Sequence, residues 1–187
     1  MGLSTLESIL EAARNSAQAR GYGGLNFRDL ASDVGIRAAS IYHHFPSKAA
    51  LGAAVARRYW EDTAADLESL VEQEPDPVVA LRRYPEIFRR SLVRGNRLCL
   101  GSFMSAEYEG LPESVQAEVQ TFADVNVAWI GGRLVEAGIV VHEDSDERAK
   151  AIFAAVSGAQ LMARSRADIA LFDMLIQSYS DVGLLPT

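Results

Sequence analysis

The segment at residues 27–51 constrains the fold of this chain more than any other, because it places two short helices around a tight turn. Asn26 is a good N-cap for a helix at Phe27–Val34, and Gly35 then ends that helix. A second short helix follows at Ala38–His44 and stops at a proline. The pattern predicts a helix-turn-helix unit whose second helix is rich in polar and aromatic side chains.

Helical spacing of apolar residues dominates the rest of the chain, and no strand-like alternation of any length occurs. Residues 72–77 have the composition of a linker. We therefore predict an all-α fold of about nine helices, with a three-helix helix-turn-helix domain at residues 1–47 and a larger helical domain at residues 48–187. The predicted helices span residues 4–19, 27–34, 38–44, 47–70, 78–94, 98–107, 113–137, 146–164 and 167–180.

Composition excludes several classes of protein. The chain has 187 residues and is 49% hydrophobic, which is enough for a substantial core. Its single cysteine, Cys99, excludes an internal disulfide and fits a reducing, cytoplasmic setting. The N-terminus lacks a basic region followed by an apolar core, and the longest charge-free apolar stretch, residues 151–163, is short. We therefore expect neither a signal peptide nor a membrane span.

The net charge of −7 is unevenly distributed. Residues 1–50 carry five basic and four acidic side chains, a net +1, which leaves −8 on the remainder. An acidic body with a near-neutral head is compatible with DNA binding, because only the contacting face must be positive.

The second short helix offers the groups that a DNA reader requires. Base edges and phosphates need hydrogen-bonding partners, and this helix supplies them on Ser40, Tyr42, His43 and His44. Arg28 and Lys48 stand at the starts of neighbouring helices, where basic side chains are good phosphate clamps. Three-helix units also serve in protein contacts, so a helical protein-interaction module without DNA binding is the alternative.

Two segments resemble the N-terminal signature of the TetR/AcrR transcriptional regulators. They are residues 35–48, which read GIRAASIYHHFPSK, and Arg20-Gly21-Tyr22 before them. The resemblance covers about Leu6 to Val55. It implies a ligand-responsive regulator, most often a repressor, that binds a palindromic double-stranded DNA operator as a homodimer. The expected DNA-binding set is Asn26, Arg28, Arg37, Ala38, Ala39, Ser40, Tyr42, His43, His44 and Lys48.

The chain departs from the family at Arg37-Ala38-Ala39, where many members have Ser-Lys-Gly or a similar sequence. Two alanines cannot donate hydrogen bonds, although they can meet thymine methyl groups. Arg37 can contact guanine or phosphate instead. The operator sequence therefore cannot be derived from the family.

The resemblance also implies a DNA-binding domain at residues 1–47 and a ligand-sensing and dimerisation domain with an effector pocket at residues 48–187. The aromatic content of the second domain suggests an apolar or aromatic small molecule. Glu107 and Asn126 are polar groups on apolar helix faces, so each needs a partner, which is either a ligand or another helix. Core packing is the simpler interpretation of most aromatic members. The candidate ligand-binding set is Tyr59, Trp60, Tyr84, Phe88, Phe103, Glu107, Phe122, Asn126 and Trp129.

Cys99 has two interpretations. Arg94 and Arg97 are nearby and the residue lies at a predicted helix start, and both features lower a thiol pKa. Because some relatives with a similar segment sense electrophiles through a cysteine, a redox- or electrophile-sensing repressor is an alternative function. A small buried apolar residue is the simpler interpretation.

The last two predicted helices have the character of a dimer interface. Residues 151–163 are apolar nearly all round, which indicates burial on more than one side. Burial within one subunit is the alternative, and the family resemblance favours the dimer. Two reading helices would then meet half-sites roughly 34–36 Å apart. The expected contact residues are Ala154, Ala155, Gly158, Ala159, Ile169, Phe172, Leu175, Ile176 and Tyr179.

We expect no metal site, no cofactor and no enzymatic activity. Adjacent helical residues point about 100° apart, so His43 and His44 cannot chelate one ion together, and His142 is predicted to lie far away in a loop. Nucleotide-binding glycine loops, paired metal ligands and serine-elbow motifs are missing from the sequence.

Overall fold

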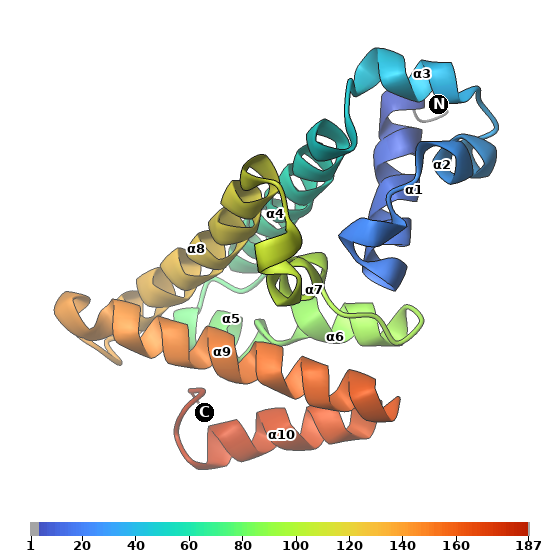
Figure 1. Cartoon of the computed structure of the whole chain (residues 1–187). Helices are drawn as coiled ribbons and strands as arrows, with labels where there is room; N and C mark the ends of the chain where they lie inside the picture. The colour runs from blue at the N-terminus through green and yellow to red at the C-terminus, as the bar shows by residue number, and fades with distance from the viewer. Residues whose placement is uncertain (1–3, 187) are drawn as a thin grey trace. The chain divides into compact units, whose positions relative to one another are not determined.

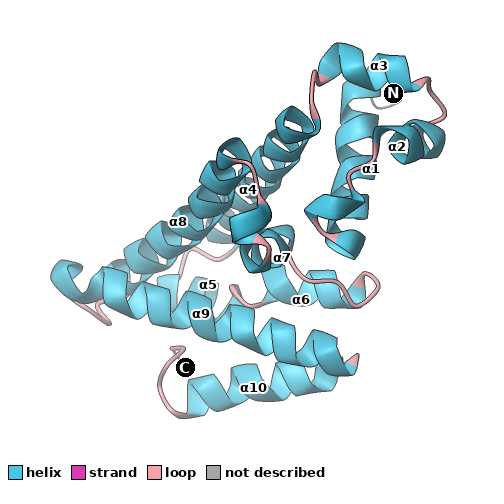
Figure 2. Cartoon of the chain, viewed as in Figure 1, coloured by secondary structure: helices cyan, strands magenta, loops and turns pink. Residues whose placement is uncertain are grey.

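The computed structural model describes residues 4–186, and over that range the chain has ten α-helices and two 3-10 helices (Figure 1). Figure 2 shows that the described part contains helices and loops alone. It divides into two compact units. The first unit runs to Glu61 and includes Cys99–Phe122, and the second comprises Asp62–Leu98 and the residues from Ala123 onward.

The first unit begins with a three-helix bundle. A capping box between Ser4 and Glu7 starts the first helix, because each side chain bonds the backbone N–H of the other residue. Ile9, Leu30 and Ile41 are fully buried, one from each helix, and form the core of the bundle. The elements are α1 (Thr5–Arg20), η1 (Tyr22–Gly24), α2 (Phe27–Val34) and α3 (Ala38–His44).

The same unit contains the first turns of two long helices and a short helix between them. The hydroxyl of Ser47 accepts the N–H of Ala50 at the start of the first long helix. The short helix packs against α1 and buries Leu100 and Met104 completely. These elements are α4 (Lys48–Gln73), α7 (Leu100–Ala106), η2 (Tyr108–Gly110) and α8 (Glu113–Glu136).

The second unit contains the later turns of α4 and α8 together with four further helices. The last two lie side by side (Figure 1), and the chain reverses between them at Ala167, whose φ is 50°. Phe88, Ile152 and Phe172 fill the core of this unit. The four helices are α5 (Pro77–Arg83), α6 (Glu86–Val93), α9 (His142–Arg166) and α10 (Ile169–Asp181).

A stripe of small and apolar residues on α9 and α10 remains exposed. Ala154, Gly158 and Leu161 lie on it along α9, and Leu161 is 55% exposed. Ala159 and Phe172 were expected at a dimer interface, but they are buried inside the subunit, at 0% and 1% exposure. These two residues pack the subunit core and cannot form part of that surface.

The expected all-α fold class is confirmed, and the main difference concerns residues 78–94, where the structure has two helices in place of one. The break falls at Pro85, because proline has no N–H to give to the carbonyl of Leu81. Asp76 caps α5 through the N–H groups of Val78 and Val79. The last long helix also starts earlier than predicted, so His142, expected in a loop, is the first residue of α9.

None of the helices within residues 4–186 combines the length and the apolar character that crossing a membrane requires.

Candidate nucleic-acid interface and effector site

The turn between α2 and α3 is built by local hydrogen bonds. The amide oxygen of Asn26 accepts the N–H groups of Arg28 and Asp29, which starts α2. Gly35 ends α2 with φ 75°, a left-handed conformation that favours glycine, and Ile36 N–H returns to the carbonyl of Ala31. Asn26 is thus the N-cap of α2. Its contact with DNA stays a prediction.

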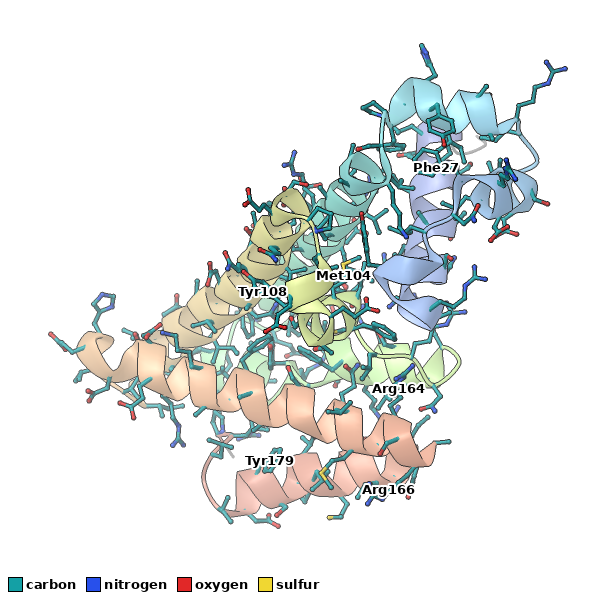
Figure 3. The ribbon with its side chains drawn as sticks, viewed as in Figure 1. Phe27, Met104, Tyr108, Arg164, Arg166 and Tyr179 are labelled. Atoms are coloured by element: carbon teal, nitrogen blue, oxygen red, sulfur yellow. The ribbon has the colours of Figure 1, made fainter. Side chains whose placement is uncertain are left out.

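Helix α3 is anchored on one side and exposed on the other. Ile41 is fully buried and Phe45 nearly so, which fixes the helix on the bundle core. Tyr42 is 58% exposed, and its ring lies 4.6 Å from that of Phe27, labelled in Figure 3. The contact limits the rotamers of Tyr42 while more than half of the residue stays in solvent. The remaining expected reader residues of this segment are exposed or half-buried: Arg37, Ala38, Ala39, Ser40, His43 and His44.

The two expected phosphate clamps differ in their surroundings. Arg28 is exposed at the first turn of α2. Lys48 is half-buried, its ammonium group donates to the carbonyl of Gly23 (3.3 Å), and it lies 4.7 Å from the ring centre of Tyr22. Lys48 therefore holds the turn after α1 as well as carrying a charge beside α3.

The candidate ligand-binding residues fall into both units. In the first unit, Tyr59 and Phe122 line a narrow cavity that is nowhere wide enough for a water molecule. Their rings lie 5.5 Å apart. An incoming ligand must therefore displace part of the wall. The other lining residues are Ala56, Leu100, Gly101, Met104, Glu118 and Val119, with Met104 labelled in Figure 3.

Glu118, which was not predicted from the sequence, is a charged group in the wall of this cavity. Its carboxylate accepts hydrogen bonds from Arg57 (3.0 Å) and from the indole N–H of Trp60 (2.8 Å). Burial raises the pKa of Glu118, but the bonds from Arg57 and Trp60 outweigh it and hold that pKa below its usual value. The available signal was an acidic residue within the apolar stripe of Val115 and Val119.

Phe103 and Glu107 lie on α7 and at its end, and both are half-buried. The Glu107 carboxylate accepts the backbone N–H of Tyr22 at 2.8 Å. The sequence indicated that Glu107 needs a partner, and in the structure this partner is the turn that follows α1.

The other four candidate residues form a cluster in the second unit. The hydroxyl of Tyr84 donates to the side-chain oxygen of Asn126 at 2.9 Å, and both residues are fully buried. The ring of Tyr84 stacks on Trp129 at 5.7 Å and meets Phe88 edge-on at 5.6 Å. The partner of Asn126 is thus another segment of the same core.

Cys99 is 2% exposed and is the N-cap of α7. Burial raises the pKa of its thiol despite hydrogen bonding to Ser102. The expectation of a lowered pKa is wrong, because desolvation of the fully buried thiolate outweighs the hydrogen bonds with Ser102, Tyr59 and Gly101 that favour it.

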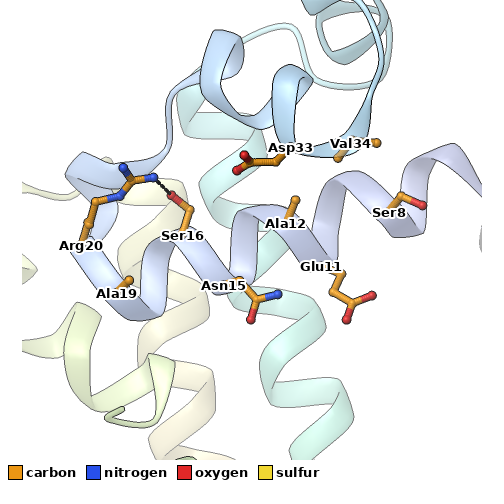
Figure 4. A pocket seen from close by; sticks show the side chains of 9 residues that line it. All are labelled: Ser8, Glu11, Ala12, Asn15, Ser16, Ala19, Arg20, Asp33 and Val34. Atoms are coloured by element: carbon orange, nitrogen blue, oxygen red, sulfur yellow. Dashed lines mark hydrogen bonds between the residues drawn. The ribbon is translucent and has the colours of Figure 1, made fainter. Parts of the chain in front are cut away.

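Figure 4 shows a second hollow, an open one along α1 that is bounded by Asp33 and Val34 of α2. Arg20 donates to the hydroxyl of Ser16 within it (2.8 Å). None of the predicted site residues lines this hollow. Across residues 4–186, His, Cys, Asp and Glu nowhere gather in threes around a potential metal position.

The sequence family described as "Bacterial regulatory proteins, tetR family" matches residues 9–55. Among curated protein sequences, none matches the chain. The structure is similar to a TetR transcriptional regulator from Legionella pneumophila, with TM-score 0.90 and 29% identity over 97% of this chain and 99% of the other. A TetR-family regulator from Agrobacterium tumefaciens is similar with a TM-score of 0.87 and 28% identity, over 95% of this chain and 96% of the other. Escherichia coli NemR, in its reduced form, shares the fold at 21% identity, with TM-score 0.84 over 96% and 97%.

The helix-turn-helix geometry and these matches define a DNA-binding transcriptional regulator. Residues 9–55 match the TetR family, and the chain has the fold of the TetR-family regulators to which it is similar.

Proposed function

We propose that the chain is a cytoplasmic repressor that binds a palindromic operator as a homodimer and leaves it when a small apolar or aromatic effector binds. Residues 1–47 read DNA, and residues 48–187 bind the effector and form the dimer. The observation that carries the proposal is the exposure of Tyr42, His43 and His44 on a helix that Ile41 fixes to the core.

The exposed stripe on α9 and α10 supports a two-fold interface. Leu161 and Met174 are each 55% exposed, and Ala154 and Gly158 are small enough for close approach of a partner helix. A homodimer through these helices presents two copies of α3 to two half-sites, so the operator should be a near-palindrome.

The lining of the cavity beside Tyr59 and Phe122 is apolar apart from Glu118, which favours a small apolar or aromatic effector that enters by displacing part of this wall. The effector acts by binding more tightly to the state that has low operator affinity, and its differential affinity sets the coupling. Burial of Cys99 favours this scheme over the electrophile-sensing alternative.

The test is selection of the purified protein on random duplex DNA, followed by sequencing of the retained molecules. Recovery of a palindrome is the expected result, with affinity that falls steeply as salt rises. His43→Ala should weaken binding to the recovered duplex, whereas His142→Ala, a matched change in the second unit, should not. Failure to retain any sequence at low salt would overturn the proposal in favour of a protein-interaction module.

A further inference from the structure

The end of α7 meets the turn that follows α1 through one carboxylate. Glu107 caps the C-terminus of α7, and its Oε2 accepts the N–H of Tyr22 at 2.8 Å. A side chain at Gly21 would put its Cβ 2.2 Å from Oε1 of Glu107, and Gly21 also has φ 69°. The absence of a side chain at Gly21 thus leaves room for this carboxylate. Tyr22 and Glu107, which form the hydrogen bond, are 85 residues apart in the sequence.

The same turn is held from its other side by α4. Lys48 bonds the carbonyl of Gly23 and lies over the ring of Tyr22. That ring packs so closely on Gly52 that a Cβ there would lie 2.7 Å from it. Tyr22 therefore stands where α1, α4 and α7 meet, directly before the reading helices.

The opposite end of α7 forms a wall of the cavity. Leu100, Gly101 and Met104 line it, and a Cβ at Gly101 would lie 2.2 Å from the ring of Phe122. Because the cavity cannot admit even water, any occupant must push α7 or Phe122 aside. A helix of seven residues moves largely as one piece, so its displacement at Gly101 also moves Glu107.

We propose that Glu107 is a positioning residue that links the cavity to the DNA-reading helices by holding the N–H of Tyr22. An occupant of the cavity displaces α7, the carboxylate pulls or releases the turn at Tyr22, and the orientation of α2 and α3 changes. This linkage rests on the proposed function, since it requires a DNA reader and a cavity that accepts an effector.

Gly101→Ala provides an effector-free probe, because the added methyl group forces α7 and Phe122 apart. We expect it to weaken binding to the selected duplex at least about fivefold when Glu107 is present, the lower range of allosteric coupling. In the Glu107→Ala background the same change should have an effect of less than about twofold. Glu107→Gln, which keeps an accepting oxygen, should restore part of the effect. Glu109→Ala, an exposed neighbour, should leave the effect intact.

Amide exchange of Tyr22 tests the contact without DNA. Glu107→Ala should accelerate exchange of the Tyr22 N–H about tenfold, the effect of losing one charge-assisted hydrogen bond. The N–H of Ile36, which bonds to Ala31 in the other turn, should be unaffected. If Gly101→Ala does not fold, Ala56→Leu overfills the same cavity from α4 and takes its place.

Equal effects of Gly101→Ala with and without Glu107, or unchanged exchange at Tyr22, would overturn the linkage while leaving the repressor proposal standing. An unchanged duplex affinity in Gly101→Ala would also overturn it. Failure of the native protein to bind any duplex would remove both proposals together, which separates the two outcomes.

Discussion

Tyr84→Phe tests whether the hydrogen bond between Tyr84 and Asn126 stabilises the core or whether the two residues are available to bind a ligand. The change removes one hydroxyl and leaves the ring on Trp129, so apolar burial and stacking are retained. The oxygen of Asn126 then loses its bond from Tyr84 in a fully buried position. Loss of a buried partner costs about 1–3 kcal/mol. For a chain of this length each kcal/mol lowers Tm by about 2–4 °C, so we expect a decrease of about 2–12 °C.

Urea and thermal unfolding followed by circular dichroism measure this change, with both proteins at one concentration because a dimer makes Tm concentration-dependent. Tyr42→Phe is the matched control, since its exposed hydroxyl should contribute less than about 0.5 kcal/mol. A Tyr84→Phe protein as stable as this control would refute the reasoning. The hydroxyl would then not support the core, and the pair would become a candidate for effector contact.

Four further results are expected. Tyr42→Ala should weaken operator binding at least about tenfold in fluorescence anisotropy while the protein remains folded by circular dichroism, and an unchanged affinity would remove Tyr42 from the reader. Cys99 should react with a disulfide reagent roughly a hundredfold more slowly in the native protein than in urea, because it is buried and its pKa is raised; equal rates would restore the sensor hypothesis. Folding lowers the pKa of Glu118 below the ordinary 4.5, so its carboxylate stabilises the protein above that pH and ceases to do so as pH falls through the folded pKa. The difference in free energy of unfolding between the native protein and Glu118→Gln should become smaller in acid. A difference that grows in acid would contradict the lowered pKa of Glu118. Leu161→Asp should give a monomer by light scattering while Val93→Asp, on a residue 57% exposed, should not; a Leu161→Asp dimer would place the interface elsewhere.

The sequence by itself was sufficient for the fold class and for the shape of the reader. The information there is local: Asn26 caps α2, Gly35 supplies the left-handed turn, and the spacing of Ile41 and Phe45 marks the buried side of α3. Caps, glycines and helical periodicity act within a few residues, so they are visible in a single chain. The one helix predicted at residues 78–94 failed because the effect of Pro85 in mid-helix was overlooked.

The partners of polar groups were decided by tertiary structure alone. The sequence indicated that Glu107 and Asn126 needed partners, but the partners are Tyr22 and Tyr84, which lie 85 and 42 residues away along the chain. Packing likewise raises the pKa of Cys99 where neighbouring charges suggested the opposite. Desolvation and long-range hydrogen bonds depend on which helix faces meet, and that choice is made by the whole core rather than by any local motif.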